Sequence, residues 1–244
     1  MSTILDSGRP HAPPAQTSIP HAMRLEVDFR RRMTARDRTV TLDVRFTSTV
    51  DRLVLFGPSG AGKTLTLLAI AGLVAPDEGR IVCDEEVWND SARGIAMPAR
   101  KRRVGLVFQD YALFPHLNVH DNVAAVHRRG FPRALSVEQR GDVEGLLEAF
   151  GLMPVRESYP AQISGGQRQR TALARALAGS PRMLLLDEPF SALDEPLRRA
   201  ARDELASVQA RRGIPVVLIT HDPRDIDAFA QDVVALEDGR VVAR

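Results

Sequence analysis

The chain has 244 residues, of which 44% are hydrophobic, and a formal net charge of +2. This apolar content is enough for one large domain or two small ones with a real core, which excludes a disordered chain. Although the sequence pI is about 9.1, the 33 basic residues are interleaved with 31 acidic ones along the whole chain, so we expect no nucleic-acid partner.

The first 22 residues predict a mobile N-terminal tail, because they contain four prolines and no apolar periodicity. They also lack the continuous apolar stretch of a signal peptide. No later segment approaches the roughly 20 apolar residues of a membrane-spanning helix, so a membrane role would require separate membrane subunits. The single cysteine, Cys83, cannot form an intrachain disulfide, which fits a reducing cytoplasm.

The first part of the predicted domain, from Met23, has the pattern of antiparallel strands. Apolar and polar residues alternate between charged turns, and the buried strand RLVLFG then leads into a glycine loop. A helix is expected in TLTLLAIAGLVAPDEG, closed by Pro76 and Gly79. The strand pattern resumes in GRIVCDEEVWND and, after the basic linker MPARKRRVG, in VGLVFQ.

The middle of the chain, from about residue 110 to 175, is mainly helical in pattern, and strands return at RMLLLDEP and VVLITHD with a helix between them. Apolar strands that alternate with helices predict a parallel sheet covered on both faces. The predicted fold class is therefore α/β, with a mainly parallel sheet. We expect one domain over residues 23–244, with an N-terminal antiparallel β subdomain and an inserted helical subdomain over about 110–175.

The segment GPSGAGKT is a complete GxxxxGKT motif between an apolar strand and a helix, which predicts a phosphate-binding loop. Lys63 would reach the β and γ phosphates, and Thr64 would offer its hydroxyl to Mg²⁺. A glycine-rich turn without a ligand is the alternative, and the flanking strand and helix argue against it. The predicted phosphate ligands are Gly57, Pro58, Ser59, Gly60, Ala61, Gly62, Lys63 and Thr64.

Four polar residues stand at the carboxyl ends of predicted parallel strands, where ligands bind in open α/β sheets. Asp187 is predicted to hold Mg²⁺, and Glu188 to orient or deprotonate an attacking water. His221 could donate a hydrogen bond to a γ phosphate, and Gln109 could contact Mg²⁺ or the water. Helix caps and turn residues are the alternative for each of them.

A second anion site is predicted at ISGGQRQR, where Ser164, Gly165 and Gly166 open a helix. Free backbone N–H groups and the positive end of the helix dipole point outward there. The residues alone leave open which anion this site faces.

In this order and spacing, GPSGAGKT, Gln109, ISGGQ, LLLDEP, SALD and His221 resemble the ATP-binding subunit of ABC transporters, from about Met23 to the end of the chain. The resemblance implies a P-loop NTPase (RecA-like) core, ATP and Mg²⁺ as cofactors, and ATP hydrolysis. It also implies that two copies pair head to tail. Ser164, Gly165, Gly166 and Gln167 of one copy would then close on the ATP held by the other.

The stretch from Val87 to Ala124 looks most like the ATPase subunit of molybdate importers, and sulfate, polyamine and iron importers share parts of it. This implies a peripheral subunit at the cytoplasmic face of the membrane, with permease subunits as partners and, indirectly, a solute-binding protein. Tyr111, Leu113 and Phe114 are expected to be exposed for docking on the permease, with core packing as the alternative. Related subunits often have a C-terminal regulatory domain, which we do not expect here.

The sequence departs from the family pattern at two places. The family commonly stacks adenine on an aromatic residue before the P-loop. RRRMTARDR offers none, since Phe29 is expected in a strand core, and contact through Arg32 or Met33 stays open. Ile163 replaces the usual leucine.

Two other functions are less consistent with the sequence. A DNA-associated ABC ATPase would carry a long coiled coil between Thr64 and Ser164, but only about a hundred residues separate them here, without sustained heptads. A P-loop kinase acting alone would have no use for the SGGQ helix.

Overall fold

The computed structural model describes residues 23–35, 38–127, 134–191 and 193–243, so the predicted tail over residues 1–22 lies outside these ranges. The strands are β1 (Leu25–Ala35), β2 (Arg38–Ser48), β3 (Arg52–Phe56), β4 (Glu78–Cys83), β5 (Glu86–Asp90), β6 (Ile95–Ala96), β7 (Val104–Val107), β8 (Met183–Asp187), β9 (Val216–Thr220), β10 (Asp232–Glu237) and β11 (Arg240–Ala243). The helices are α1 (Lys63–Ala71), α2 (Ala99–Arg102), α3 (Val119–Ala124), α4 (Val137–Ala149), α5 (Gly165–Ala178), α6 (Glu195–Arg212) and α7 (Pro223–Phe229).

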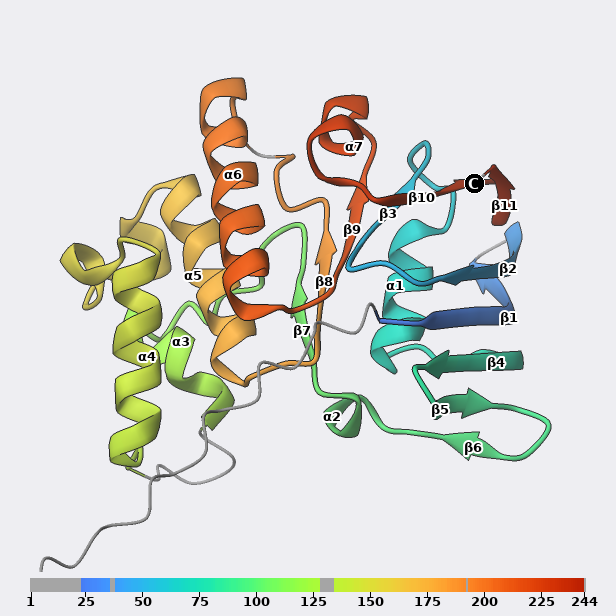
Figure 1. Ribbon diagram of the computed structural model, residues 1–244, viewed down its shortest axis with the longest axis horizontal. Helices are drawn as coiled ribbons and strands as arrows, with labels where there is room; N and C mark the ends of the chain where they lie inside the picture. Colours follow the sequence, from blue (N-terminus) through green and yellow to red (C-terminus); the bar gives the residue numbers. More distant parts are fainter. Residues whose placement is uncertain (1–22, 36–37, 128–133, 192, 244) are drawn as a thin grey trace, which may run out of the picture.

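Within the described ranges, 11 strands form one sheet in the order β6-β5-β4-β1-β2-β11-β10-β3-β9-β8-β7. Strands β10, β3, β9, β8 and β7 are parallel, and β6, β5, β4, β1 and β2 pair antiparallel (Figure 1). The predicted α/β fold class is confirmed. No helix of the described chain is both long and apolar enough to cross a membrane.

The parallel strands bury both faces, because alternate side chains point to opposite sides. Leu53 and Leu55 of β3 face a core that includes Leu67 and Ile70 of α1, whereas Val54 faces the core of the helical side. Helix α1 and helix α5 therefore pack in different cores, on opposite faces of the parallel strands.

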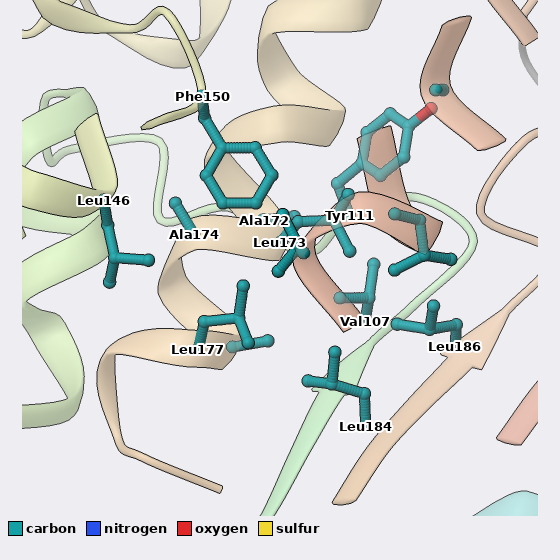
Figure 2. Packing of buried hydrophobic residues seen from close by; sticks show 14 of the residues in the cluster. Val107, Tyr111, Leu146, Phe150, Ala172, Leu173, Ala174, Leu177, Leu184 and Leu186 are labelled. Atoms are coloured by element: carbon teal, nitrogen blue, oxygen red, sulfur yellow. The ribbon is translucent and has the colours of Figure 1, made fainter. Parts of the chain in front are cut away.

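The helical core is built from α4, α5 and β8. Figure 2 shows Phe150, just after α4, together with Leu173 and Leu177 of α5, gathered near Leu184 and Leu186 of β8. All five side chains are at most 2% exposed. At roughly 25 cal/mol per Å² of apolar surface, such burial is the main stabilising contribution of these helices.

Tyr111 corrects one prediction, because its ring belongs to this core and is only 5% exposed (Figure 2). Leu113 is half-buried and packs against the same cluster, while Phe114 is 42% exposed. Tyr111 was expected at the surface because it lies beside Gln109 in the segment predicted to dock on the permease. The chain instead turns back at this residue and directs the ring inward.

Helix α1 also ends earlier than predicted, at Gly72 rather than near Pro76 and Gly79. Gly72 adopts a left-handed conformation, φ 78°, and Gly79 lies within β4. The buried Arg102 guanidinium donates to two carbonyl oxygens in the last turn of α1, at 2.7 and 2.8 Å. A Cβ at Gly72 would lie 2.6 Å from Arg102 Nε, so this close approach requires glycine.

Cys83 of β4 is fully buried, and burial raises the pKa of its thiol to about 12. We expect its thiolate fraction at pH 8 to be about 1,000-fold below that of a free thiol, so Cys83 should resist a thiol reagent in the folded protein. Ellman's reagent should detect one thiol only after denaturant is added. Rapid labelling of the native protein would contradict this placement.

Candidate functional site

The carboxyl ends of four neighbouring parallel strands meet at one edge of the sheet and bring the predicted site residues together. Strand β3 leads into the glycine loop, and β8 ends at Asp187 with Glu188 directly after it. His221 follows β9, and Gln109 lies two residues beyond β7.

The glycine loop is pressed against two strands. Gly57 has φ 151°, and a Cβ there would lie 2.1 Å from the Leu236 carbonyl oxygen. Gly62 has φ 96°, and a Cβ there would lie 2.2 Å from Leu42 Cδ2. By contrast, a Cβ at Gly60, with φ 85°, would meet nothing within 4 Å. Among the described side chains, none caps the start of α1. The first turn of α1 therefore presents backbone N–H groups to an anion.

Lys63 folds back over this loop. Its Nζ donates to the carbonyl oxygens of Gly57 and Pro58, at 2.7 and 2.8 Å, and the residue is 5% exposed. Burial lowers the pKa of Lys63, and the nearby carboxylates of Glu188 and Asp187 oppose this shift. The site thus holds a buried cation over the loop, with two anions near it.

Thr64 and Asp187 form the second contact of the site. Thr64 Oγ1 donates to Asp187 Oδ1 at 3.2 Å, and Asp187 is 5% exposed. Burial raises the pKa of Asp187, against the hydrogen bond from Thr64 and the attraction of Lys63. A hydroxyl and a carboxylate at this separation are the oxygen ligands that Mg²⁺ prefers.

The neighbouring Glu188 points toward the end of β9. Its backbone is left-handed, φ 45°, and Glu188 Oε1 lies 3.2 Å from His221 Nδ1. The Glu188 side chain is 14% exposed, whereas that of His221 is 55% exposed. The two adjacent acids therefore contact different partners, one on α1 and the other after β9. A left-handed non-glycine residue at a strand end is a strained geometry typical of functional sites.

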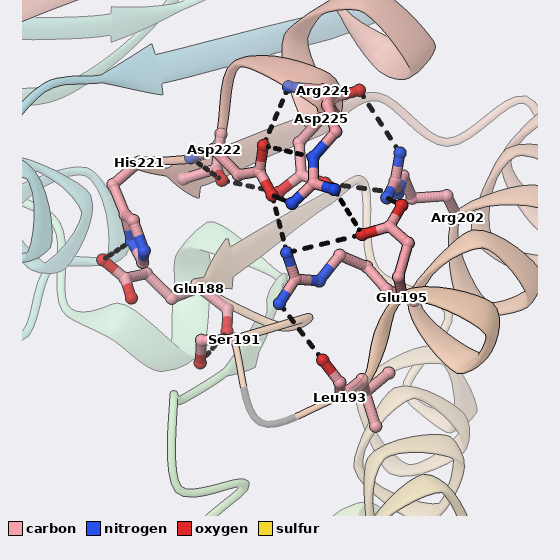
Figure 3. Close-up of polar contacts among 11 residues, drawn as sticks. Glu188, Ser191, Leu193, Glu195, Arg202, His221, Asp222, Arg224 and Asp225 are labelled. Atoms are coloured by element: carbon pink, nitrogen blue, oxygen red, sulfur yellow. Dashed lines mark hydrogen bonds and ion pairs between the residues drawn. The ribbon is translucent and has the colours of Figure 1, made fainter.

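Hydrogen bonds and ion pairs hold the residues on either side of His221 (Figure 3). Thr220 Oγ1 donates to Asp225 Oδ2 at 2.6 Å and accepts from the N–H of Asp222 at 3.0 Å. Asp222 also binds Arg198 of α6, at 2.6 Å. The arginines on both sides hold the pKa of Asp222 well below its usual range, Arg224 by hydrogen bonding and Arg198 by charge.

Sequence reasoning missed this cluster. Arg198 donates at 3.1 Å to the carbonyl of Leu193, in the SALD segment, and so connects that segment to Asp222. Arg202 pairs with Glu195 at 3.0 Å and with Asp225 at 3.2 Å. The spacing of residues 195, 198 and 202 places three charges on one helix face, a signal that could have indicated this ion-pair network.

The residues of the second predicted anion site form a capped helix start, away from the glycine loop. Ser164 Oγ accepts from Gln167 N at 3.2 Å and Gln167 Oε1 accepts from Ser164 N at 2.9 Å, which makes a capping box at the start of α5. A Cβ at Gly166 would meet nothing within 4 Å. Figure 1 places α5 and α1 on opposite sides of β7, β8 and β9. One copy of the chain therefore does not bring this site onto its own glycine loop.

Residues 42–191 match the model of the ABC transporter family. The chain belongs to the ABC transporter family. The matched segment includes the glycine loop, Gln109, the SGGQ turn, Asp187 and Glu188, while His221 lies beyond it.

Curated relatives of this ABC transporter chain are import ATP-binding proteins. A molybdenum import ATP-binding protein of Albidiferax ferrireducens is 42% identical over 189 residues, which cover 78% of this chain and 50% of the relative. An Fe(3+) ions import ATP-binding protein of Mesorhizobium japonicum is 45% identical, covering 82% and 53%. A sulfate/thiosulfate import ATP-binding protein of Xanthomonas campestris pv. campestris is also 45% identical, covering 83% and 57%. The chain spans about half the length of these relatives.

Solved ABC structures have the same fold. A dimeric bacterial ABC transporter cassette superposes with a TM-score of 0.73 and 27% identity, covering 90% of this chain and 97% of that one. The dimeric post-hydrolysis state of an ATP-binding cassette, bound to ADP and Pi, gives a TM-score of 0.72 and 26% identity over the same shares.

The family's aromatic contact to adenine has no counterpart in Phe29, which is 2% exposed in β1 and packs in the core as predicted. Arg32 is exposed and Met33 is half-buried in the same strand.

Proposed function

We propose that the chain is the ATP-hydrolysing subunit of an ABC importer, acting at the cytoplasmic face of the membrane on separate permease subunits. One observation carries the hydrolytic part of this proposal. At the end of β8, Asp187 contacts Thr64 of the glycine loop, while Glu188 contacts His221. One strand end thus supplies both a metal-side carboxylate and a separate base.

The residues fit Mg²⁺ and ATP. When bound, these supply the phosphoanhydride to be cleaved and the cation that neutralises its oxygens. Thr64 and Asp187 would hold the cation, and Lys63 would exchange its two carbonyl partners for phosphate oxygens. Glu188 would accept a proton from the attacking water, with His221 donating to the γ phosphate and Gln109 contacting the cation or the water.

The same proposal includes a head-to-tail dimer of two copies. Helices α1 and α5 lie on opposite faces of the parallel strands, so the capped start of α5 is free to face a nucleotide on another chain. The cassettes compared above are dimeric. Ser164, Gly165, Gly166 and Gln167 would then complete the partner's site.

For the solute we propose molybdate or a related oxyanion, delivered indirectly by a solute-binding protein. The relatives are named for molybdenum, for sulfate or thiosulfate, and for Fe(3+). Molybdate and sulfate are both tetrahedral dianions, which supports an oxyanion as the solute. An importer of sulfate itself, of a polyamine or of iron is the alternative to a molybdate importer. Phe114, exposed on the loop that follows β7, remains a candidate contact to the permease.

Transport by the complex tests this proposal. The chain should co-purify with its membrane subunits. Vesicles containing the complex, with the solute-binding protein outside, should take up molybdate only with both Mg²⁺ and ATP in the lumen. EDTA in the vesicle lumen should abolish uptake. Excess sulfate outside should compete with molybdate if the importer accepts oxyanions generally. Uptake of Fe³⁺ or a polyamine without molybdate uptake would contradict the oxyanion assignment. Failure of the complex to hydrolyse ATP would contradict the whole proposal.

A further inference from the structure

The loop that carries Gln109 contains a strained turn. Tyr111 and Ala112 have φ 64° and 41°, so two consecutive non-glycine residues are left-handed. A left-handed backbone is strained for residues other than glycine, because Cβ approaches the following carbonyl oxygen. Within the turn, Tyr111 N donates to the Phe108 carbonyl at 2.9 Å and Ala112 N donates to Asp110 Oδ1 at 3.2 Å. The carbonyl oxygens of Tyr111 and Ala112, by contrast, are bound from outside the turn.

Arg175 of α5 contacts both strained residues. Its two terminal nitrogens donate to the carbonyl oxygens of Tyr111 and Ala112, each at 2.7 Å. The guanidinium carbon also lies 5.4 Å from the ring centre of Phe114. Hydrogen bonds from a charged donor are stronger than those between neutral groups, so these two contacts offset the backbone strain. Burial lowers the pKa of Arg175, against the attraction of Asp110.

The same helix begins at the SGGQ turn, about three helical turns before Arg175. Helix α5 also packs closely on β7, because a Cβ at Gly105 would lie only 2.6 Å from the Ala176 carbonyl oxygen. At its far end the loop is held by the buried Asn122, whose Oδ1 accepts from Phe114 N at 2.8 Å. The loop is therefore fixed mainly from the helices.

We propose that Arg175 is a positioning residue for Gln109: by holding the Tyr111–Ala112 turn, it couples the start of α5 to Gln109. The proposal rests on the function given above, in which α5 of one copy meets the nucleotide of the other. Closure of the dimer on Ser164 would then move Gln109 of the same chain together with α5. Contact between the SGGQ turn and the partner's nucleotide would therefore also change the position of Gln109.

Hydrogen exchange on the full chain without nucleotide tests the mechanical part. Arg175→Met keeps the apolar stem and removes the donors, so exchange in a peptide covering residues 109–114 should accelerate by about tenfold or more. Adding Ala112→Gly removes the cost of a left-handed alanine and should restore most of the protection. Ala125→Gly, at φ −57°, is the matched control and should restore none. Unchanged exchange in Arg175→Met, or equal rescue by both glycines, would overturn the proposal.

Steady-state ATP hydrolysis tests the coupling. Arg175→Met should lower kcat by about tenfold, in parallel with Gln109→Ala, while the KM for ATP stays near that of the parent, and Ala112→Gly should recover most of the loss. Thermal unfolding checks that every variant is folded. If exchange accelerates and kcat stays normal while Gln109→Ala is impaired, the coupling is wrong. If Gln109→Ala itself is unimpaired, the role of Gln109 in the proposed function fails, and the exchange result still decides whether Arg175 holds the turn.

Discussion

Replacing Glu188 with glutamine should lower ATP hydrolysis by about two to four orders of magnitude while ATP still binds. Glutamine keeps the shape and one acceptor oxygen, so the 3.2 Å contact to His221 Nδ1 can persist, but it cannot take a proton from water. Glutamate and glutamine have about the same backbone strain at the left-handed φ of residue 188. The loss should therefore appear in the chemical step and not in folding.

Single-turnover hydrolysis and equilibrium binding of ATP separate these effects. Glu85→Gln is the matched control, since Glu85 is an exposed acid in the turn between β4 and β5. It should hydrolyse ATP as the parent does. Near-normal turnover by Glu188→Gln would defeat the assignment of Glu188 as the base.

Lys63→Ala should be inactive even at high ATP concentration. The change removes the buried ammonium that lies over the glycine loop, so both phosphate binding and stabilisation of the transferred phosphoryl group should be lost. The protein should remain folded, because the hydrogen bonds described for the ammonium go to two loop carbonyls and burial disfavours its charge.

The chain provides an unusually clean control for this variant, because its only other lysine is Lys101, exposed on α2. Lys101→Ala should keep the parent's hydrolysis rate and ATP affinity. If Lys63→Ala hydrolysed ATP normally, the phosphate-loop assignment would be wrong.

Local signals explain what the sequence could predict. Continuous apolar strands followed by polar residues located the ends of β8 and β9, and the glycine motif located the start of α1. The GRIVCDEEVWND segment is strand, as its pattern indicated, although it forms two antiparallel strands, β4 and β5, where the pattern predicted strand without a turn. These features depend on residues close together in the chain, so pattern and composition are sufficient to find them.

The missed features depend on distant partners. Gly72 ends α1 because Arg102 approaches it from 30 residues further along the chain. Strands β10 and β11 complete the sheet beside β3 and β2, although their short alternating pattern gave no indication of where they pair. Tyr111 is buried only because the turn held by Arg175 directs it inward. Similarly, Asp187 and Glu188 contact different partners because Thr64 of α1 lies beside one carboxylate and His221, after β9, lies beside the other.

The central claim is that the SGGQ turn of one copy faces the ATP of the other, and light scattering tests it most directly. The Glu188→Gln protein should be a monomer of 26.8 kDa without nucleotide and a dimer of twice that mass with ATP. Gly165→Asp in this background should bind ATP and stay monomeric, because the new carboxylate would oppose the γ phosphate. An acid at the first position of α5 favours the helix, so folding should not suffer. Gly141→Asp, at an open glycine of α4, is the matched control and should still dimerise. ATP-dependent dimerisation of Gly165→Asp equal to that of its parent would contradict the claim.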